Sequence, residues 1–168
     1  LKGEVLEKKL NYWKDKLDDV SPLQIRTDFE RKTVLSTKGA SAVYKIDEKL
    51  TSELQKLSKK EGTTLFMTLL TAFKILMYRY TGNTDVCIGT PLAGRQHHEL
   101  DGLIGYLINT LALRSDLSGD PGFSELLKQV KATTMEAYDN QDVPFEKVVE
   151  AVVKERETGK SPLFQVMF

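Results

Sequence analysis

Two apolar stretches joined by a polar loop, Asp85-Val-Cys-Ile-Gly-Thr90 and Leu103-Ile-Gly-Tyr-Leu-Ile-Asn-Thr-Leu-Ala-Leu-Arg114, decide the fold of this chain. The first stretch predicts a buried strand, and the Pro91 and Gly94 that follow it predict its end. The second stretch, rich in Leu, Ile and Tyr, predicts a longer strand. Residues 95–102 between them are polar and predict a loop.

Helical patterns flank this pair on both sides. Apolar residues at helical spacing predict helices over 5–17, 48–60, 65–80, 123–138 and 145–153. Asp47 and one of Thr63 or Thr64 are expected to cap helix starts, and Gly62 is expected to end a helix. Pro144 is expected at the first position of the last helix. Strand-like patterns at 41–46 and 163–168 complete the order.

Helices and strands interleave, which predicts an α/β or α+β fold with a mixed sheet covered by helices. Residues 1–39 are expected to form a lead-in helix and a linker. The last predicted strand, 163–168, is apolar and lacks a polar tail, and a strand edge needs a neighbour or protection. We therefore expect the 168 residues to be a single, partial domain.

Composition excludes several classes of partner. The 24 basic residues balance the 24 acidic ones, which disfavours binding to nucleic acid or to an anionic membrane. The chain has no apolar stretch of the roughly 20 residues that a membrane span needs. Cys87 is the single cysteine, so no internal disulfide can form, which suits a cytoplasmic location. Its apolar neighbours predict a buried hydrophobe and not a nucleophile.

The segment His97-His98-Glu-Leu-Asp101-Gly102 is the most tempting chemical motif. A His–Asp pair could act as a general base, because histidine titrates near neutral pH. The alternative, which we favour, is an exposed polar loop without chemistry. A zinc site is disfavoured, since such sites draw three or four ligands from separated positions.

Gly89 to Arg95 forms a glycine-containing loop after a strand, but it lacks the lysine and hydroxyl residue of a phosphate-binding loop. The Arg95 guanidinium could bind a carboxylate in a bidentate manner or could be solvated at the surface. Asn109 and Thr110 lie inside an apolar strand, and they could line a cleft or lie on its outer face.

Four segments in this order resemble the condensation domains of nonribosomal peptide synthetases. They are residues 89–95, 103–114, 140–146 and 161–168, and the segment 62–82 and the helix with Tyr12 and Trp13 are similar as well. The resemblance covers the whole chain. It implies one lobe of a chloramphenicol acetyltransferase-like fold, in which two lobes enclose a tunnel.

The resemblance also implies the function. Carrier proteins deliver a donor acyl thioester and an acceptor aminoacyl thioester, and the acceptor amine attacks the donor to form an amide. No metal or directly bound cofactor is implied, because the phosphopantetheine arm belongs to the carrier proteins. The implied partners are the donor and acceptor carrier proteins, the other lobe and the adjacent synthetase domains.

Site residues carry over position by position. Arg95 is implied to pair with an aspartate of the other lobe, and Asn109 and Thr110 to lie at the tunnel floor. The implied binding set is Gly94, Arg95, Gly105, Asn109 and Thr110. A second set, Asn140, Gln141, Pro144 and Phe145, is implied to pack and to shape the cleft.

The chain departs from the family's His-His-x-x-x-Asp-Gly signature. Its own histidine segment has two residues between His98 and Asp101 and follows Gly94-Arg95, so we expect it to be a coincidence. The chain is then the C-terminal lobe, without catalytic residues of its own and inactive alone. Two rivals remain: a module that docks carrier proteins without chemistry, and a stand-alone acyltransferase using His97 or His98.

Overall fold

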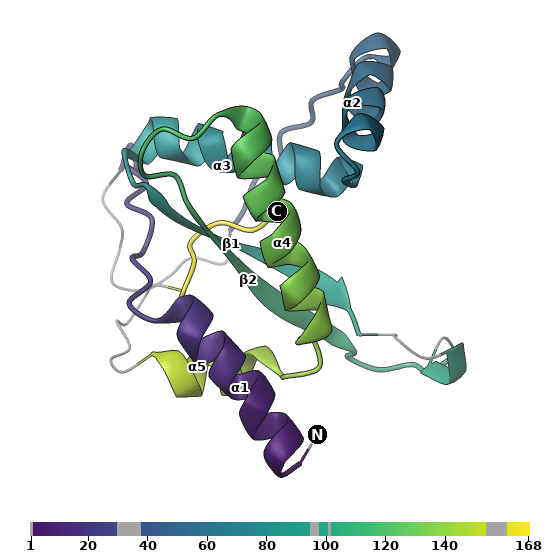
Figure 1. Ribbon diagram of the computed structural model, residues 1–168, viewed down its shortest axis with the longest axis vertical. Helices are drawn as coiled ribbons and strands as arrows, with labels where there is room; N and C mark the ends of the chain where they lie inside the picture. Colours follow the sequence, from purple (N-terminus) through teal and green to yellow (C-terminus); the bar gives the residue numbers. More distant parts are fainter. Residues whose placement is uncertain (1, 30–37, 95–97, 101, 154–160) are drawn as a thin grey trace.

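The computed structural model describes residues 2–29, 38–94, 98–100, 102–153 and 161–168, and in them five α-helices accompany a strand pair (Figure 1). The helices are α1 (Glu4–Leu17), α2 (Glu48–Lys60), α3 (Leu65–Thr81), α4 (Phe123–Asp139) and α5 (Phe145–Val152). The strands are β1 (Asp85–Ala93) and β2 (Ile108–Asp116), and a short 3₁₀ helix, His98–Leu100, lies between them. The predicted class, helices packed on a sheet, is confirmed.

The helix ends follow their predicted signals closely. Asp47 accepts a hydrogen bond from the Leu50 N–H, and Thr64 accepts one from the Met67 N–H. Gly62 has the positive φ expected just after a helix. Pro144 differs by one position, because it precedes α5 as its N-cap.

Strands β1 and β2 pair antiparallel from Asp85 with Asp116 to Ala93 with Ile108. The predicted break at Pro91 is wrong, since β1 continues through it to Ala93. The Gly89 N–H, two residues earlier, donates away from β2 to the Val166 carbonyl. Alternation points the Pro91 nitrogen the same way, so the missing N–H removes no bond to β2. The second strand begins at Ile108 and not at Leu103.

The C-terminal segment adds a parallel contact to β1 at a single isolated bridge, so the sheet of the described residues is the antiparallel pair β1–β2 and not the mixed sheet that was predicted. Met167 forms an isolated bridge with Gly89, and the Phe168 N–H donates to the Gly89 carbonyl at 2.9 Å. The predicted strand 163–168 is thus reduced to one bridge. A Cβ on Gly89 would lie 2.3 Å from the Phe164 ring, so this position must be glycine for the ring to pack there.

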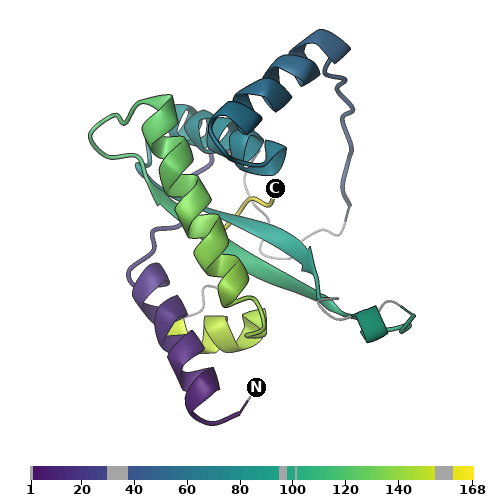
Figure 2. The same cartoon turned by 45° about the vertical axis from the view of Figure 1, so that its right-hand side comes forward.

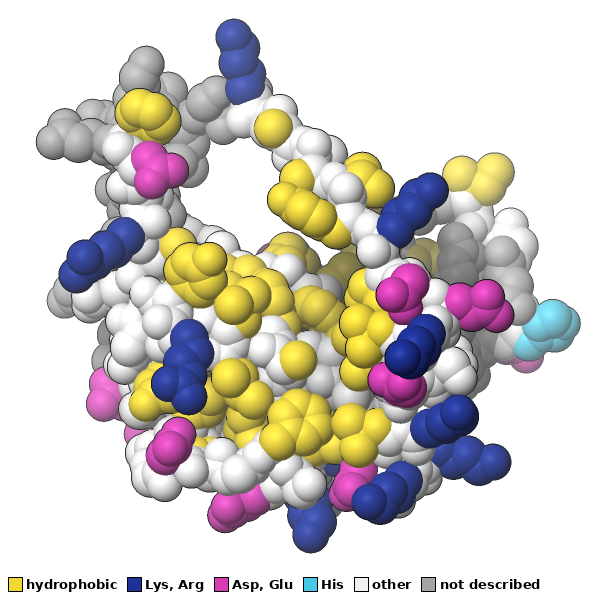
Figure 3. Space-filling view, turned by 90° about the horizontal axis from the view of Figure 1, so that it is seen from above, with side chains coloured by type: hydrophobic (Ala, Val, Ile, Leu, Met, Phe, Trp, Pro, Cys, Tyr) yellow, Lys and Arg dark blue, Asp and Glu magenta, His cyan; other side chains and the backbone are white. Residues whose placement is uncertain are grey.

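The predicted strand at 41–46 is wrong. These residues form no strand, and Tyr44 is 89% exposed. Figure 3 shows the stretch leading to α2 standing away from the body, with apolar side chains on both sides of an open gap. The alternating pattern had no strand to pair with among the described residues, and period two alone does not make a sheet.

Helices α3 and α4 pack on each other and on the two strands (Figure 2). Side chains alternate along a strand, so Leu111, Leu113 and Ser115 share one face, and Ser115 contacts α3 through Lys74. The even-numbered β2 residues take the other face, where Arg114 reaches the end of α1. Apolar side chains fill the core between these elements, including Trp13, Leu17, Leu70, Val86, Ile88, Leu113, Leu127 and Val130.

Candidate functional site

The predicted binding residues that can be placed gather at the far end of the strand pair. Gly94 directly follows β1, and Asn109 and Thr110 lie near the start of β2. Gly105 lies in the exposed loop before β2. Arg95 lies outside the described residues, so its predicted ion pair stays a prediction. Figure 2 shows this end projecting from the helices.

Gly94 closes the strand pair. Its N–H donates to the Leu107 carbonyl at 2.8 Å, which adds one rung beyond the last strand residues. A Cβ at this position would lie 2.2 Å from that same oxygen. Glycine is therefore required here by the close approach of two backbones, and this requirement alone accounts for the residue type.

The Asn109 side chain binds the turn between α4 and α5. Its Nδ2 donates to the carbonyls of Gln141 and Val143, at 2.7 and 2.9 Å. Its Oδ1 accepts from the Phe145 N–H at 3.0 Å. The sequence left two places open for Asn109, a cleft wall or an outer face. The structure places both ends of the amide against another part of the chain.

Thr110 points to the opposite face from Asn109. At this end of the sheet that face is thinly covered: Pro91 and Ala93 are exposed, Ile108 is 54% exposed, and Thr110 is partly buried. Leu103, Ile104 and Tyr106 in the loop beyond are exposed as well. Small and apolar side chains thus form an uncovered surface, which we call the hairpin surface (residues 91, 93, 103, 104, 106, 108 and 110).

The structure does not test whether the histidine segment forms a site, so our expectation of a loop without chemistry stays a prediction. His98 lies in the exposed start of the 3₁₀ helix, and His97 and Asp101 lie outside the described residues. Among the residues that the structure describes, no cluster of three or more His, Cys, Asp or Glu side chains could hold a metal ion.

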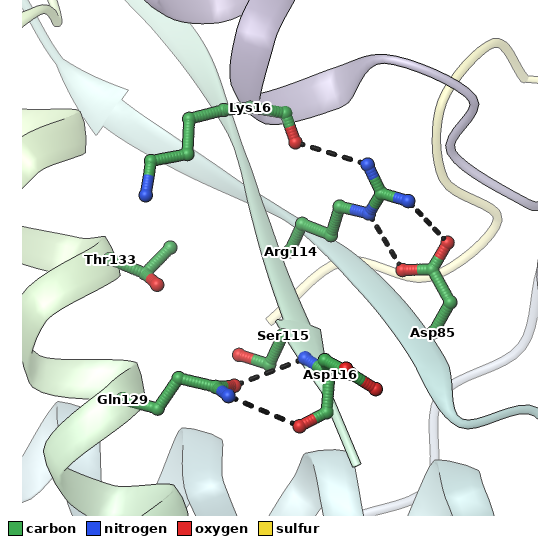
Figure 4. A pocket seen from close by; sticks show the side chains of 7 residues that line it. All are labelled: Lys16, Asp85, Arg114, Ser115, Asp116, Gln129 and Thr133. Atoms are coloured by element: carbon green, nitrogen blue, oxygen red, sulfur yellow. Dashed lines mark hydrogen bonds and ion pairs between the residues drawn. The ribbon is translucent and has the colours of Figure 1, made fainter. Parts of the chain in front are cut away.

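A polar pocket of about 450 Å³ lies at the opposite end of the strands (Figure 4). Arg114 forms a bidentate ion pair with Asp85, at 2.8 and 3.0 Å, and also donates to the Lys16 and Asp18 carbonyls. The bond to Asp85 raises the pKa of Arg114. Gln129 pairs both ends of its amide with the Asp116 backbone. These groups satisfy one another, and they fasten α1 and α4 to the sheet.

Lys74 is a buried residue that the sequence reading missed. It lies in α3 with 0% of its surface exposed, and its Nζ donates to the Leu113 carbonyl and to Ser115 Oγ, both at 2.7 Å. Burial lowers its pKa to about 7. A lysine in the middle of a helix that is apolar nearly all round was the available signal, because buried lysines need paired partners.

Cys87 is buried, as predicted. Burial raises the pKa of its thiol to about 12, which keeps it protonated and inert as a nucleophile. No described helix is long and apolar enough to cross a membrane.

Sequence comparison adds independent evidence. The family model for the condensation domain matches residues 1–168. The chain is 52% identical over its whole length to one of the linear gramicidin synthase proteins of Brevibacillus parabrevis, and it spans 3% of that protein. It is 47% identical over 161 residues to chondramide synthase cmdD of Chondromyces crocatus, with 96% of the chain and 4% of that protein covered.

Solved structures agree. The X-domain from teicoplanin biosynthesis superposes with a TM-score of 0.93 at 25% identity, over 99% of this chain and 37% of that one. A four-domain nonribosomal peptide synthetase, crystallised with AMP and glycine, gives a TM-score of 0.90 at 29% identity, over 99% of this chain and 13% of that one. With the family model matched from end to end, the chain belongs to the condensation-domain family of nonribosomal peptide synthetases.

Proposed function

We propose that the chain is the C-terminal lobe of a condensation domain whose intact form joins a carrier-bound donor to a carrier-bound aminoacyl acceptor. The observation that carries this proposal is the match of the condensation family along residues 1–168, together with a fold that covers about a third of a solved relative. The relatives are peptide synthetases, and amide formation is the chemistry of that family.

In this reaction the acceptor amine attacks the carbonyl carbon of the donor thioester. A C–N bond forms, the C–S bond breaks, the thiolate leaves on the donor carrier, and the amine loses a proton. The phosphopantetheine arms of the carriers supply both substrates. This lobe would contribute by holding the acceptor amine and the donor thioester in line, and such positioning can account for a large share of the rate enhancement.

The exposed hairpin surface supports the proposal that a second lobe packs against this one. Exposed apolar side chains at Leu103, Ile104, Tyr106 and Ile108 gather on one projecting end, and contiguous patches of this kind mark interfaces. We propose that the other lobe covers this surface, that Arg95 pairs with an aspartate there, and that the protein works in the cytoplasm beside its carrier domains.

A transfer assay tests the proposal. The intact domain, with donor and acceptor carriers loaded, is expected to form the amide, which mass spectrometry of the acceptor carrier detects. Tight binding of both carriers without any amide would instead establish the docking-module alternative.

The acyltransferase alternative is tested by His98→Ala in the same assay. We expect a rate within about twofold of the unaltered domain, because His98 lies in the exposed 3₁₀ helix. A loss of a hundredfold or more, about 2.7 kcal/mol of transition-state stabilisation, would make His98 a catalytic residue.

A further inference from the structure

We infer that Asn109 is a positioning residue for amide formation, acting by locking the α4–α5 turn onto the start of β2. This inference rests on the proposed function. Its basis is the three hydrogen bonds from one side chain to three backbone groups of the turn, at 2.7, 2.9 and 3.0 Å. Both amide hydrogens and the amide oxygen are used, so the geometry of this contact is fixed in three directions.

The turn is also held from its other side, by α1. Lys9 Nζ donates to the Asp139 carbonyl and pairs with Asp142 at 2.7 Å, and Trp13 Nε1 donates to the Asn140 carbonyl at 3.1 Å. Helix α1 thereby fixes the turn to the body of the lobe. Asn109 is the link through which the projecting end of β2 is fixed to that same turn.

The turn also contacts the opposite face of the sheet, through Phe145. Phe145, whose N–H binds Asn109, packs its ring 5.5 Å from the Phe164 ring, and Phe164 occupies the space over Gly89 on β1. The turn therefore contacts β2 through Asn109 and β1 through the two phenylalanines. These contacts hold both strands next to their exposed ends, at Pro91 and Ala93 in β1 and at Ile108 in β2.

Thr110, the neighbour of Asn109, belongs to the hairpin surface. A strand that is free to pivot at residue 109 would carry this surface with it. Displacements of about 1 Å at positioning groups can lower rates by about a hundredfold without contact to the reacting atoms. We therefore expect Asn109 to act on the rate of the chemical step and not on substrate binding.

The test compares two isosteric changes in the intact domain: Asn109→Asp near the start of β2, and Gln129→Glu in α4, whose side chain binds Asp116 at the end of β2. Gln129 offers a matched control, because its amide also binds backbone groups, donating to the Asp116 carbonyl and accepting from the Asp116 N–H, both at 3.1 Å. Each change replaces an amide donor by a carboxylate that faces a carbonyl. Urea midpoints show how far each variant is destabilised.

For Asn109→Asp we expect kcat to fall about 10- to 100-fold with KM within about twofold. Lowering the pH should restore part of this loss, because a protonated carboxyl can again donate to one of the two carbonyls, while its other oxygen accepts from the Phe145 N–H. Gln129→Glu should leave kcat, KM and the pH profile unchanged. A third variant, Asn109→Ser, removes the three bonds without adding a charge and covers the case in which Asn109→Asp does not fold.

Amide exchange at Phe145 gives a readout that does not need activity. We expect the Phe145 amide to exchange faster in both Asn109 variants than in the unaltered domain. In Gln129→Glu it should exchange at the unaltered rate. Wild-type kcat in a folded Asn109 variant whose Phe145 exchanges faster overturns this inference alone, as does equal loss of kcat in Gln129→Glu. An unaltered domain that forms no amide overturns the proposed function, and this inference with it.

Discussion

Lys74 and Cys87 are two buried titratable side chains whose pKa values move in opposite directions. Burial lowers the pKa of Lys74 from 10.5 to about 7, so between these values the unfolded chain holds a proton that the folded chain has released. The free energy of unfolding therefore rises with pH across that window. Burial raises the pKa of Cys87 from 9.0 to about 12, so above pH 9 the thiol acts in the other direction.

The first prediction follows for pH 7 to 9, where Lys74 acts without Cys87. We expect the free energy of unfolding of the intact domain to rise over this range, by at most about 1.4 kcal/mol per pH unit, the limit for one proton. Lys74→Met should remove this rise, and Lys128→Met, at an exposed position of α4, should keep it. Urea titrations at pH 7, 8 and 9 measure it; an unchanged slope in Lys74→Met would contradict the assignment.

Residue types alone could not predict these roles. Lys74 and Asn109 each depend on partners more than 30 positions away, at Leu113 and at Gln141 to Phe145. The family resemblance did select Asn109 and Gly94 as important. It could not say that Asn109 would hold a turn, because that depends on how α4 and α5 are folded around β2.

Among the elements, α1 is fastened to the sheet through Arg114. Its planar guanidinium meets Asp85 with two bonds and the end of α1 with two more, which an ammonium cannot reproduce. We predict that Arg114→Lys lowers the free energy of unfolding by about 1–3 kcal/mol. Urea titration measures this loss.

Amide exchange at Ser21 tests the same contact locally. The Ser21 N–H donates to Asp85, so it should exchange faster in Arg114→Lys. Arg79→Lys, at an exposed position of α3, provides the control. Protection of Ser21 equal to that of the unaltered domain would show that Arg114 does not hold this joint.

The contact between β1 and the C-terminal segment gives a prediction about packing. In Gly89→Ala the new Cβ would overlap the Phe164 ring, which should cost about 1–3 kcal/mol of stability. Combining it with Phe164→Leu should cost less than the sum of the two single changes, because the smaller side chain relieves the overlap. A thermodynamic cycle from four urea titrations measures this coupling, and strictly additive losses would rule out the overlap.

Helices were predictable as elements, and strands were predictable only where their partners lie nearby. Asp47 and Thr64 cap helices as predicted, since a cap is a local contact. Residues 41–46 have the pattern of a strand but no pairing among the described residues. Pro91 misled the prediction because its effect depends on which side of β1 its nitrogen faces.

At the scale of the whole molecule, the hairpin surface tests the proposal of a second lobe. Ile104 is exposed in the described chain, so Ile104→Asp leaves the contacts of the described residues intact. In the intact domain we expect it to destabilise the lobe contact and to lower the melting temperature by a few degrees. Val5→Asp, at an exposed apolar position on α1, should leave the melting temperature nearly unchanged. Equal melting temperatures for Ile104→Asp and the unaltered domain would argue against burial of this surface.

The glycine at position 89 also limits how synthetases can be recombined. Gly89 leaves the space in which the Phe164 ring packs, and the two residues are encoded 75 positions apart. A chimera whose crossover falls between these positions takes residue 89 from one parent and residue 164 from the other. Such hybrids should fold when the first parent supplies glycine here, and a parent with any larger residue will need its own C-terminal segment.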